Sequence, residues 1–205
     1  MTEDYLGVEH MRELFKKANT MSDRSYEVYQ GIFGFSDSEL KNKGVVDLGS
    51  GVTQKFARDA LRKGIKIISI NPELTKHDLR EAGKNSTFEN IASKIYRKKR
   101  ESLAADSYNL PLADESVDVL FSVMAVPHYL PEEETSIQQS FDEMIRVLKG
   151  NGKMYLLYHP KEGDTLVRTN LDRLRTENMD VGTVTTPEGY EIVTIEKRGL
   201  ESQQT

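Results

Sequence analysis

The sequence has no cysteine, and none of its apolar runs approaches the length of a membrane span. The absence of cysteine excludes disulfides, thiolate catalysis and any Cys-ligated zinc or iron–sulfur site. A membrane-spanning helix needs about 18–20 apolar residues. The N-terminal stretch MTEDYLGVEHMRELFKK also lacks the apolar segment of a secretory signal. We therefore expect no membrane attachment and a cytoplasmic location.

An excess of positive charge is also missing. The chain has 28 Lys and Arg residues against 33 Asp and Glu, which gives a net charge of −5. An acidic chain has no general electrostatic attraction to nucleic acids or anionic membranes. His10 and His77 are isolated, and no His/Asp/Glu spacing indicates a metal site. The sequence therefore predicts no metal.

Short apolar runs alternate with segments of helical periodicity through most of the 205 residues. The expected strands are 44–48, 65–70, 117–123 and 153–158, and the expected helices between them are 53–64 and 131–150. Continuous apolar runs are typical of strands that are covered on both faces. Strands that alternate with helices indicate βαβ units. The fold class predicted is therefore α/β, with a doubly wound, mostly parallel sheet.

Both ends of the chain differ from this alternating pattern. Residues 8–18 and 23–33 have helical spacing, and we expect residues 1–40 to form a helical cap on a Rossmann-like domain of residues 41–205. Near the C-terminus, a helix at 165–179 precedes two strands, 181–186 and 190–197, joined by a Pro-Gly turn. This hairpin is expected to add two antiparallel strands to one edge of the sheet. The whole is expected to be a single structural domain.

The stretch GVVDLGSGVT, residues 44–53, places an acid directly before a glycine turn. In open parallel sheets, ligands bind outside the carboxyl ends of the strands, at the switch in strand order. Gly49 and Gly51 allow a tight turn and close approach of a ligand, so a larger residue at Gly49 is expected to block binding while the chain stays folded. Asp47 would repel a pyrophosphate but tolerate an ammonium or sulfonium ligand. A tight strand–helix turn without a ligand is the simpler alternative.

This stretch resembles motif I, D/E-x-G-x-G, of the class I S-adenosylmethionine-dependent methyltransferases. The resemblance implies a seven-stranded Rossmann-like methyltransferase fold. It also implies that Asp47, Gly49, Ser50 and Gly51 hold the methionine end of S-adenosylmethionine, with S-adenosylhomocysteine as product. Thr53 stands where a third glycine is often found, and we expect it to cap the following helix.

Three later stretches fall in the order of the same family, so that the resemblance covers about residues 40–160. In IISINPEL, Asn71 replaces the usual acidic ribose ligand; an amide still bonds a diol, without charge assistance. A third similar stretch is AADSYNLPLADESVDVLFS. Its resemblance to the family implies that Asp106 and Ser107 lie at the adenine of the cofactor. EMIRVLKGNG resembles the R-V-L-K-P-G-G segment. By the same resemblance, the backbone from Ser122 to Met124 lines the site.

The acceptor is less well marked, because methyl transfer requires alignment more than a fixed catalytic motif. His128 and His159 follow the strands 117–123 and 153–158, and are candidates for a general base or a substrate contact. Each is equally suited to anchoring a loop. A small-molecule acceptor is the first expectation. Oligomeric state is not indicated.

Residues 94–100 contain five basic side chains around a tyrosine, so a nucleic-acid methyltransferase is an alternative. A solvated helix face also explains this cluster. Two further alternatives are an inactive methyltransferase-like binding or scaffold protein, which Asn71 favours, and an NAD-binding Rossmann protein. Asp47 and the missing G-x-G-x-x-G spacing argue against the last of these.

Overall fold

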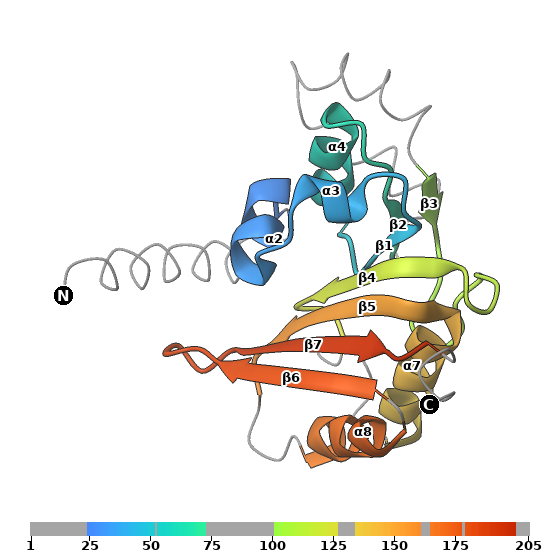
Figure 1. The fold of residues 1–205 in the computed structure, drawn as a ribbon, viewed down its shortest axis with the longest axis vertical. Helices are drawn as coiled ribbons and strands as arrows, with labels where there is room; N and C mark the ends of the chain where they lie inside the picture. Colours follow the sequence, from blue (N-terminus) through green and yellow to red (C-terminus); the bar gives the residue numbers. More distant parts are fainter. Residues whose placement is uncertain are drawn as a thin grey trace.

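A computed structural model describes residues 24–51, 53–72, 101–126, 134–160, 165–177 and 179–199. These residues form a seven-stranded sheet with helices on both faces (Figure 1). The strands are β1 Val45–Leu48, β2 Ile68–Ile70, β3 Glu101–Leu103, β4 Val117–Val123, β5 Leu148–Tyr158, β6 Met179–Thr185 and β7 Glu191–Lys197. The helices are α2 Tyr26–Phe33, α3 Asp37–Leu40, α4 Lys55–Arg62, α7 Glu134–Val147 and α8 Thr165–Thr176.

The strand order is β3-β2-β1-β4-β5-β7-β6. The first five strands in this order pair in parallel, while β7 pairs antiparallel to both β5 and β6. After β1 the chain proceeds toward one edge through β2 and β3, and then returns to place β4 on the other side of β1. The switch in strand order therefore lies between β1 and β4, which is where such sheets bind ligands. The predicted Rossmann-like fold with a C-terminal antiparallel hairpin is confirmed.

The sheet separates two apolar layers, because alternate side chains of each strand point to opposite faces. One layer, beneath α2 and α4, contains Phe56, Phe121 and Tyr155. The other, beneath α7 and α8, contains Leu120 and Phe141. Both layers consist of buried apolar side chains, and the sheet between them carries the candidate site at its carboxyl edge.

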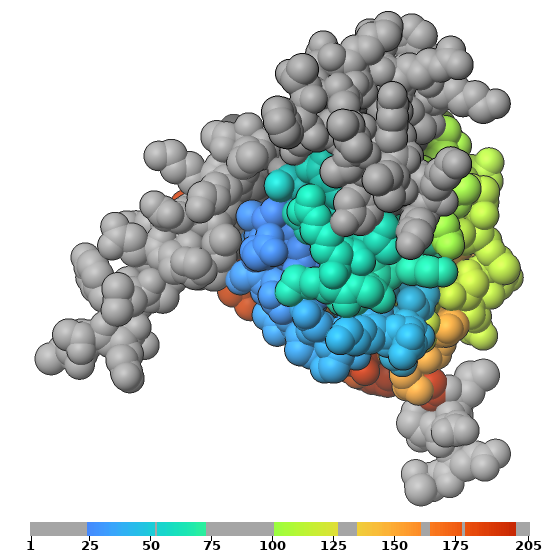
Figure 2. Space-filling view, turned by 90° about the horizontal axis from the view of Figure 1, so that it is seen from above, coloured from blue at the N-terminus to red at the C-terminus, as the bar shows by residue number. Residues whose placement is uncertain are grey.

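Helix α2 joins the first layer through a cluster of aromatic rings. Ser25 is its N-cap, and its Oγ accepts a hydrogen bond from the Val28 amide at 3.4 Å. Tyr29 stacks on Phe56 of α4 with ring centroids 3.9 Å apart, and Tyr26 is fully buried. In Figure 2, the blue surface of α2 and α3 adjoins the teal surface of α4. The described part of the expected cap, residues 24–40, thus shares the core of the sheet.

Several predicted boundaries were wrong by a few residues. Helix α4 begins at Lys55, with Gln54 rather than Thr53 at the N-cap position. Residues 65–67 are not part of β2, because the Ile65 amide donates to the Ala60 carbonyl and closes the end of α4. Helix α7 ends at Val147, and α8 ends at Thr176. Leu148 instead begins β5 and Met179 belongs to β6, since pairing along the sheet outweighs continued helical periodicity.

Two short elements were not predicted. Helix α3 lies between the expected helix 23–33 and the expected strand 44–48, and it begins with a capping box formed by Ser36 and Glu39. Strand β3 has little apolar character, and it exists because it pairs with β2 along three residues. The expected helix at 8–18 and the basic cluster at 94–100 lie outside the described residues.

Candidate functional site

The turn after β1 is built around two glycines in the left-handed region, Gly49 with φ +77° and Gly51 with φ +66°. The Gly49 amide donates to the Ile70 carbonyl at 2.8 Å, which ties the turn to the end of β2. A Cβ at Gly49 would lie 2.1 Å from the Cβ of Ala125. A larger residue at Gly49 is therefore expected to strain the turn as well as to block the approach of a ligand, because this space belongs to the loop after β4.

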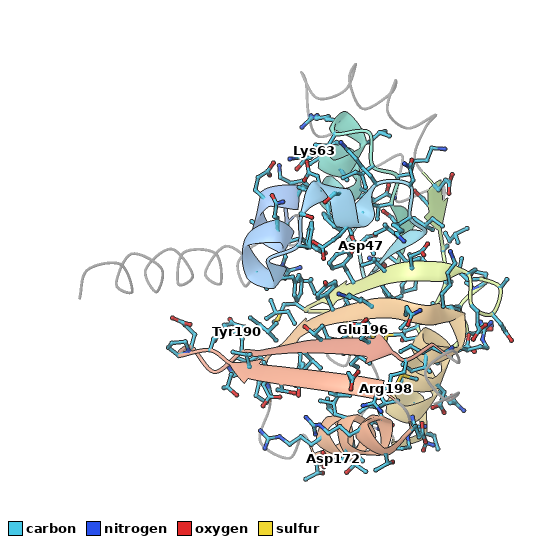
Figure 3. All side chains as sticks on the ribbon, in the orientation of Figure 1. Asp47, Lys63, Asp172, Tyr190, Glu196 and Arg198 are labelled. Carbon is cyan, nitrogen blue, oxygen red and sulfur yellow. The ribbon has the colours of Figure 1, made fainter. Side chains whose placement is uncertain are left out.

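Asp47 is fully buried on the face of the sheet that α2 and α4 cover. Tyr29 Oη donates to Asp47 Oδ1 at 2.9 Å, while Asp47 Oδ2 is buried with no hydrogen-bond partner among the described residues. Burial raises the pKa of Asp47 to about 7, although the Tyr29 hydrogen bond and the positive charge of Arg24 act in the opposite direction. Figure 3 shows Asp47 inside the fold, close to α2. A buried carboxylate oxygen without a partner is well suited to a cationic ligand.

Asn71 and Asp106 follow two adjacent strands at the same edge of the sheet. The Asn71 amide donates to the Leu103 carbonyl at 3.2 Å, so the ends of β2 and β3 are bonded to each other. Asp106 is exposed and accepts a hydrogen bond from Tyr108, which raises the pKa of that tyrosine. Ser107 is buried, and its Oγ lies 2.8 Å from Ser140 Oγ of α7. Ser107 can therefore contribute a ligand contact mainly through its backbone.

Ser122 and Met124 lie at the end of β4, beside the glycine turn. Ser122 is fully buried, and its Oγ accepts the Val126 amide at 3.1 Å. Met124 has φ +54°, and its amide donates to the Leu157 carbonyl at 2.7 Å. Both residues are therefore occupied in shaping the turn that brings Ala125 against Gly49. Their backbone, rather than the Ser122 side chain, is what they can offer to a ligand.

Of the two candidate histidines, the structure describes only His159, since His128 lies outside the described residues. His159 is exposed and directly follows β5, on the carboxyl edge of the sheet. Its Nδ1 lies 3.0 Å from the Pro160 carbonyl oxygen, and its ring packs edge-on against Tyr190 at 5.0 Å between centroids. A carbonyl oxygen only accepts, so Nδ1 is the donor in this contact.

One face of α7 holds the loop that follows β3. Besides Ser140, which contacts Ser107, Glu143 accepts the Leu110 amide through Oε2 at 2.8 Å. Arg146 donates to the carbonyls of Leu110 and Leu112, each at 3.0 Å. The R-V-L-K stretch at the end of α7 therefore holds the L-P stretch of the loop after β3 in place.

We expect Arg146→Lys to lower the free energy of unfolding by about 1–3 kcal/mol, because lysine cannot reproduce the forked contacts to two carbonyls and Glu143. Urea denaturation measures this change. The matched control is Arg175→Lys, which affects an exposed pair with Asp172 and should change stability by less than about 1 kcal/mol. Equal effects of the two substitutions would contradict the assigned role of Arg146.

Two residues near Asp47 come from the N-terminal segment. The hydrophobic spacing of residues 23–33 predicted that Tyr29 lies on a helix face, but not that it bonds Asp47. Nothing in the sequence marked Arg24, whose Nη1 donates to the Val123 carbonyl at 3.3 Å. Among the described ranges there is no group of three or more His, Asp or Glu side chains that could hold a metal. The same residues include no helix long and apolar enough to span a membrane.

Three solved structures show how the fold compares with known proteins. A candidate S-adenosyl-L-methionine-dependent methyltransferase of Methanococcus maripaludis has a TM-score of 0.55 at 18% identity, covering 94% of this chain and 92% of that chain. The 1,6-didemethyltoxoflavin-N1-methyltransferase of Burkholderia thailandensis has a TM-score of 0.54 at 13% identity, covering 95% and 86%. The geranyl diphosphate C-methyltransferase of Streptomyces coelicolor has a TM-score of 0.51 at 13% identity, covering 78% and 74%. Both of the latter were solved with S-adenosylhomocysteine.

Sequence comparison assigns the family. A search of curated proteins finds no match. A family model described as a methyltransferase domain matches residues 46–156, more than half of the 205 residues. This range begins within β1 and extends into β5, and so includes the glycine turn and the loop held by α7. The chain belongs to the class I S-adenosylmethionine-dependent methyltransferase family.

Proposed function

We propose that this chain transfers a methyl group from S-adenosylmethionine to a small-molecule acceptor. The observation that carries this proposal is the buried Asp47, whose Oδ2 has no partner among the described residues, directly before the Gly49–Gly51 turn. An α-ammonium group would supply the missing hydrogen bond and the opposite charge. The residues present therefore fit the cofactor of the family.

The remaining contacts follow the edge of the sheet away from Asp47. We assign the methionine end to Asp47 and the turn of Gly49, Ser50 and Gly51. Asn71 is assigned to the ribose hydroxyls and Asp106, with the Ser107 backbone, to the adenine. The strand order supports this assignment, because Asp47, Asn71 and Asp106 belong to or follow the neighbouring strands β1, β2 and β3. Asn71 forms neutral hydrogen bonds, so the ribose contributes less affinity than with an acid.

The cofactor supplies a methyl group that is already activated on a sulfonium. The protein's task is then to bind, orient and exclude water. We assign His159, which follows the end of β5, to an acceptor contact or to the general base for an acceptor that must lose a proton. Residues 24–40 act as the cap on this side of the sheet. The two ligand-bound neighbours were solved with 1,6-didemethyltoxoflavin and geranyl diphosphate, which supports a small acceptor.

Calorimetric titration with S-adenosylmethionine and S-adenosylhomocysteine tests the cofactor assignment. We expect binding of both, and we expect Asp106→Ala to weaken it by about 1–3 kcal/mol, because the adenine amino group loses its acceptor. Asp172→Ala, an exposed carboxylate of α8 (Figure 3), is the matched control and should leave the affinity unchanged. If neither compound binds up to millimolar concentration, the proposal is wrong. An unchanged affinity in Asp106→Ala would remove only that residue from the site.

Binding of the cofactor and methyl transfer need separate tests. Transfer of a labelled methyl group to a panel of small acceptors, with and without nucleic acid, tests the reaction itself. A chain that binds S-adenosylmethionine but transfers no methyl group to any acceptor would fit the alternative of an inactive binding protein. Stabilisation by NAD in place of S-adenosylmethionine would instead support a dinucleotide-binding protein.

A further inference from the structure

Three side chains from different elements meet where β5 ends and β7 begins. Tyr158 is the last residue of β5, Glu191 is the first residue of β7, and the two are partners in the antiparallel register. Tyr158 Oη donates to Glu191 Oε2 at 2.6 Å, and Arg168 Nη2 of α8 donates to Glu191 Oε1 at 3.0 Å. One carboxylate is therefore bound by a phenol on one oxygen and by a guanidinium on the other.

The three side chains differ sharply in burial. Tyr158 is buried and the Glu191 side chain is only 6% exposed, whereas the Arg168 side chain is 65% exposed. Burying a carboxylate is costly, and a guanidinium that lies mostly in water offsets only part of that cost. Apolar side chains of similar volume would stabilise the core at least as well. The cluster is therefore better explained by its effect on Arg168 than by its contribution to stability.

Glu191 fixes the orientation of the Arg168 guanidinium. Nη2 is bound to Glu191, and in the part of the chain that the structure describes Nε and Nη1 have no partner. A guanidinium is planar and rigid, so a contact that holds one nitrogen also limits where the remaining donors can lie. Its forked donors match the paired oxygens of a carboxylate or phosphate. An exposed guanidinium that a buried acid holds in place is therefore preorganised for an anionic ligand.

We propose that Arg168 binds an anionic group, a carboxylate or a phosphate, of the methyl acceptor, and that Glu191 is its positioning residue. The cofactor contacts assigned above extend from β1 toward β3, whereas Arg168 contacts β7, on the other side of β1. This inference rests on the proposed function and deepens it, because it names the chemical class of the acceptor. Since the chain has a net charge of −5, an anionic acceptor needs such a fixed local cation.

The test compares three probes that share a phenyl ring: benzoate, phenyl phosphate and the neutral benzamide. NMR titration of the ¹⁵N-labelled full chain, followed at the Arg168 Nε–H signal, gives a Kd for each probe. We expect at least one anion to bind about tenfold more tightly than benzamide, and the tighter anion identifies the anionic group. Arg168→Gln should raise the Kd of that anion about 10- to 100-fold, the range of one charge-assisted hydrogen bond. Arg175→Gln, in the same helix and paired with the exposed Asp172, is the matched control and should change this Kd less than about threefold.

A double-mutant cycle tests the positioning role of Glu191. Glu191→Gln keeps an oxygen for Arg168 but removes the charge that holds the guanidinium. We expect it to raise the Kd of the anion about three- to tenfold in the wild type, and to have no further effect in Arg168→Gln. An equal loss in both backgrounds would indicate a merely structural role. Since Arg168→Gln leaves the buried Glu191 carboxylate without its cation, the double variant, which carries neither charge, gives a second measure of anion binding, and we expect that binding to be lost there as well.

The outcomes separate this inference from the proposed function. If S-adenosylmethionine does not bind the wild type, the proposed function fails. If it binds, but the three probes bind equally or Arg168→Gln leaves the Kd of the anion unchanged, the anion site is wrong while the cofactor assignment stands. In the labelled-methyl screen, we expect the acceptors to carry a carboxylate or phosphate, and Arg168→Gln to raise their KM about tenfold or more with a smaller change in kcat. Transfer to neutral acceptors alone would overturn the inference.

Discussion

Asp47→Asn is expected to stabilise the protein without ligand, and to do so by about 2–3 kcal/mol more at pH 8 than at pH 5. Burial raises the pKa of Asp47 to about 7, whereas an unfolded aspartate has a pKa of about 3.9. Asparagine keeps an oxygen for Tyr29 but carries no charge. The same substitution should weaken cofactor binding, because the ammonium group loses its counterion.

The sign of the pH dependence follows from proton binding. Between pH 4 and pH 7 the unfolded chain has released the proton of Asp47, while the folded chain still holds it. The stability of the wild type therefore falls as the pH rises through this range, and the full penalty is present above pH 7. Urea denaturation of both proteins at pH 5 and pH 8 measures the difference. A gain that is equal at both pH values would contradict the raised pKa.

Asp118→Asn is a matched control for which we expect the opposite change in the free energy of unfolding. Burial acts to raise the pKa of Asp118, but Lys149, the Gly44 amide and Lys43 outweigh it, so this pKa lies below its usual range. Asp118 Oδ2 accepts from the Gly44 amide at 2.7 Å and from Lys149 at 2.8 Å. Such a carboxylate stabilises the fold above its unfolded pKa, and loses this effect as the pH falls through its folded pKa. Asp118→Asn should therefore destabilise at both pH 5 and pH 8.

Gly49→Ala is expected to lower the free energy of unfolding by about 2–5 kcal/mol, from left-handed backbone strain of about 1–2 kcal/mol and overpacking of about 1–3 kcal/mol. The new Cβ would meet the Cβ of Ala125 at 2.1 Å, in a loop that the Met124 amide anchors to β5. Urea denaturation at neutral pH gives the change. The variant should also lose cofactor binding, since the turn must shift.

The two contributions can be separated with glycines of matched conformation. Gly64 has the same φ of +77° as Gly49, but a Cβ there would have nothing within 4 Å. Gly64→Ala therefore measures the backbone strain alone. Combining Ala125→Gly with Gly49→Ala removes the methyl group that the new Cβ would meet. The double variant should therefore regain the part of the stability that overpacking had cost. If Gly49→Ala is no worse than Gly64→Ala, contact with Ala125 does not restrict Gly49.

Much of the fold follows from local sequence patterns. The apolar runs around Val46, Leu120 and Leu156 are long enough, and regular enough, to identify the central parallel strands, because strands buried on both faces need continuous apolar residues. Strand β3 could not be found in this way, since Glu101 and Ser102 have no apolar pattern and the strand forms only by pairing with β2. The boundary between α7 and β5, at Val147–Leu148, also depends on strand pairing rather than on helix propensity.

For the site, the sequence by itself determined the glycine turn that follows Asp47, because the residues of this turn are consecutive in the chain. Only the tertiary structure decided that Gly49 is restricted by Ala125, that Arg146 holds the loop after β3, and that Tyr29 donates a hydrogen bond to Asp47. Each of these contacts joins residues far apart in the chain. Local pattern does not encode such contacts, since they arise only when the packed sheet brings the ends of its strands together.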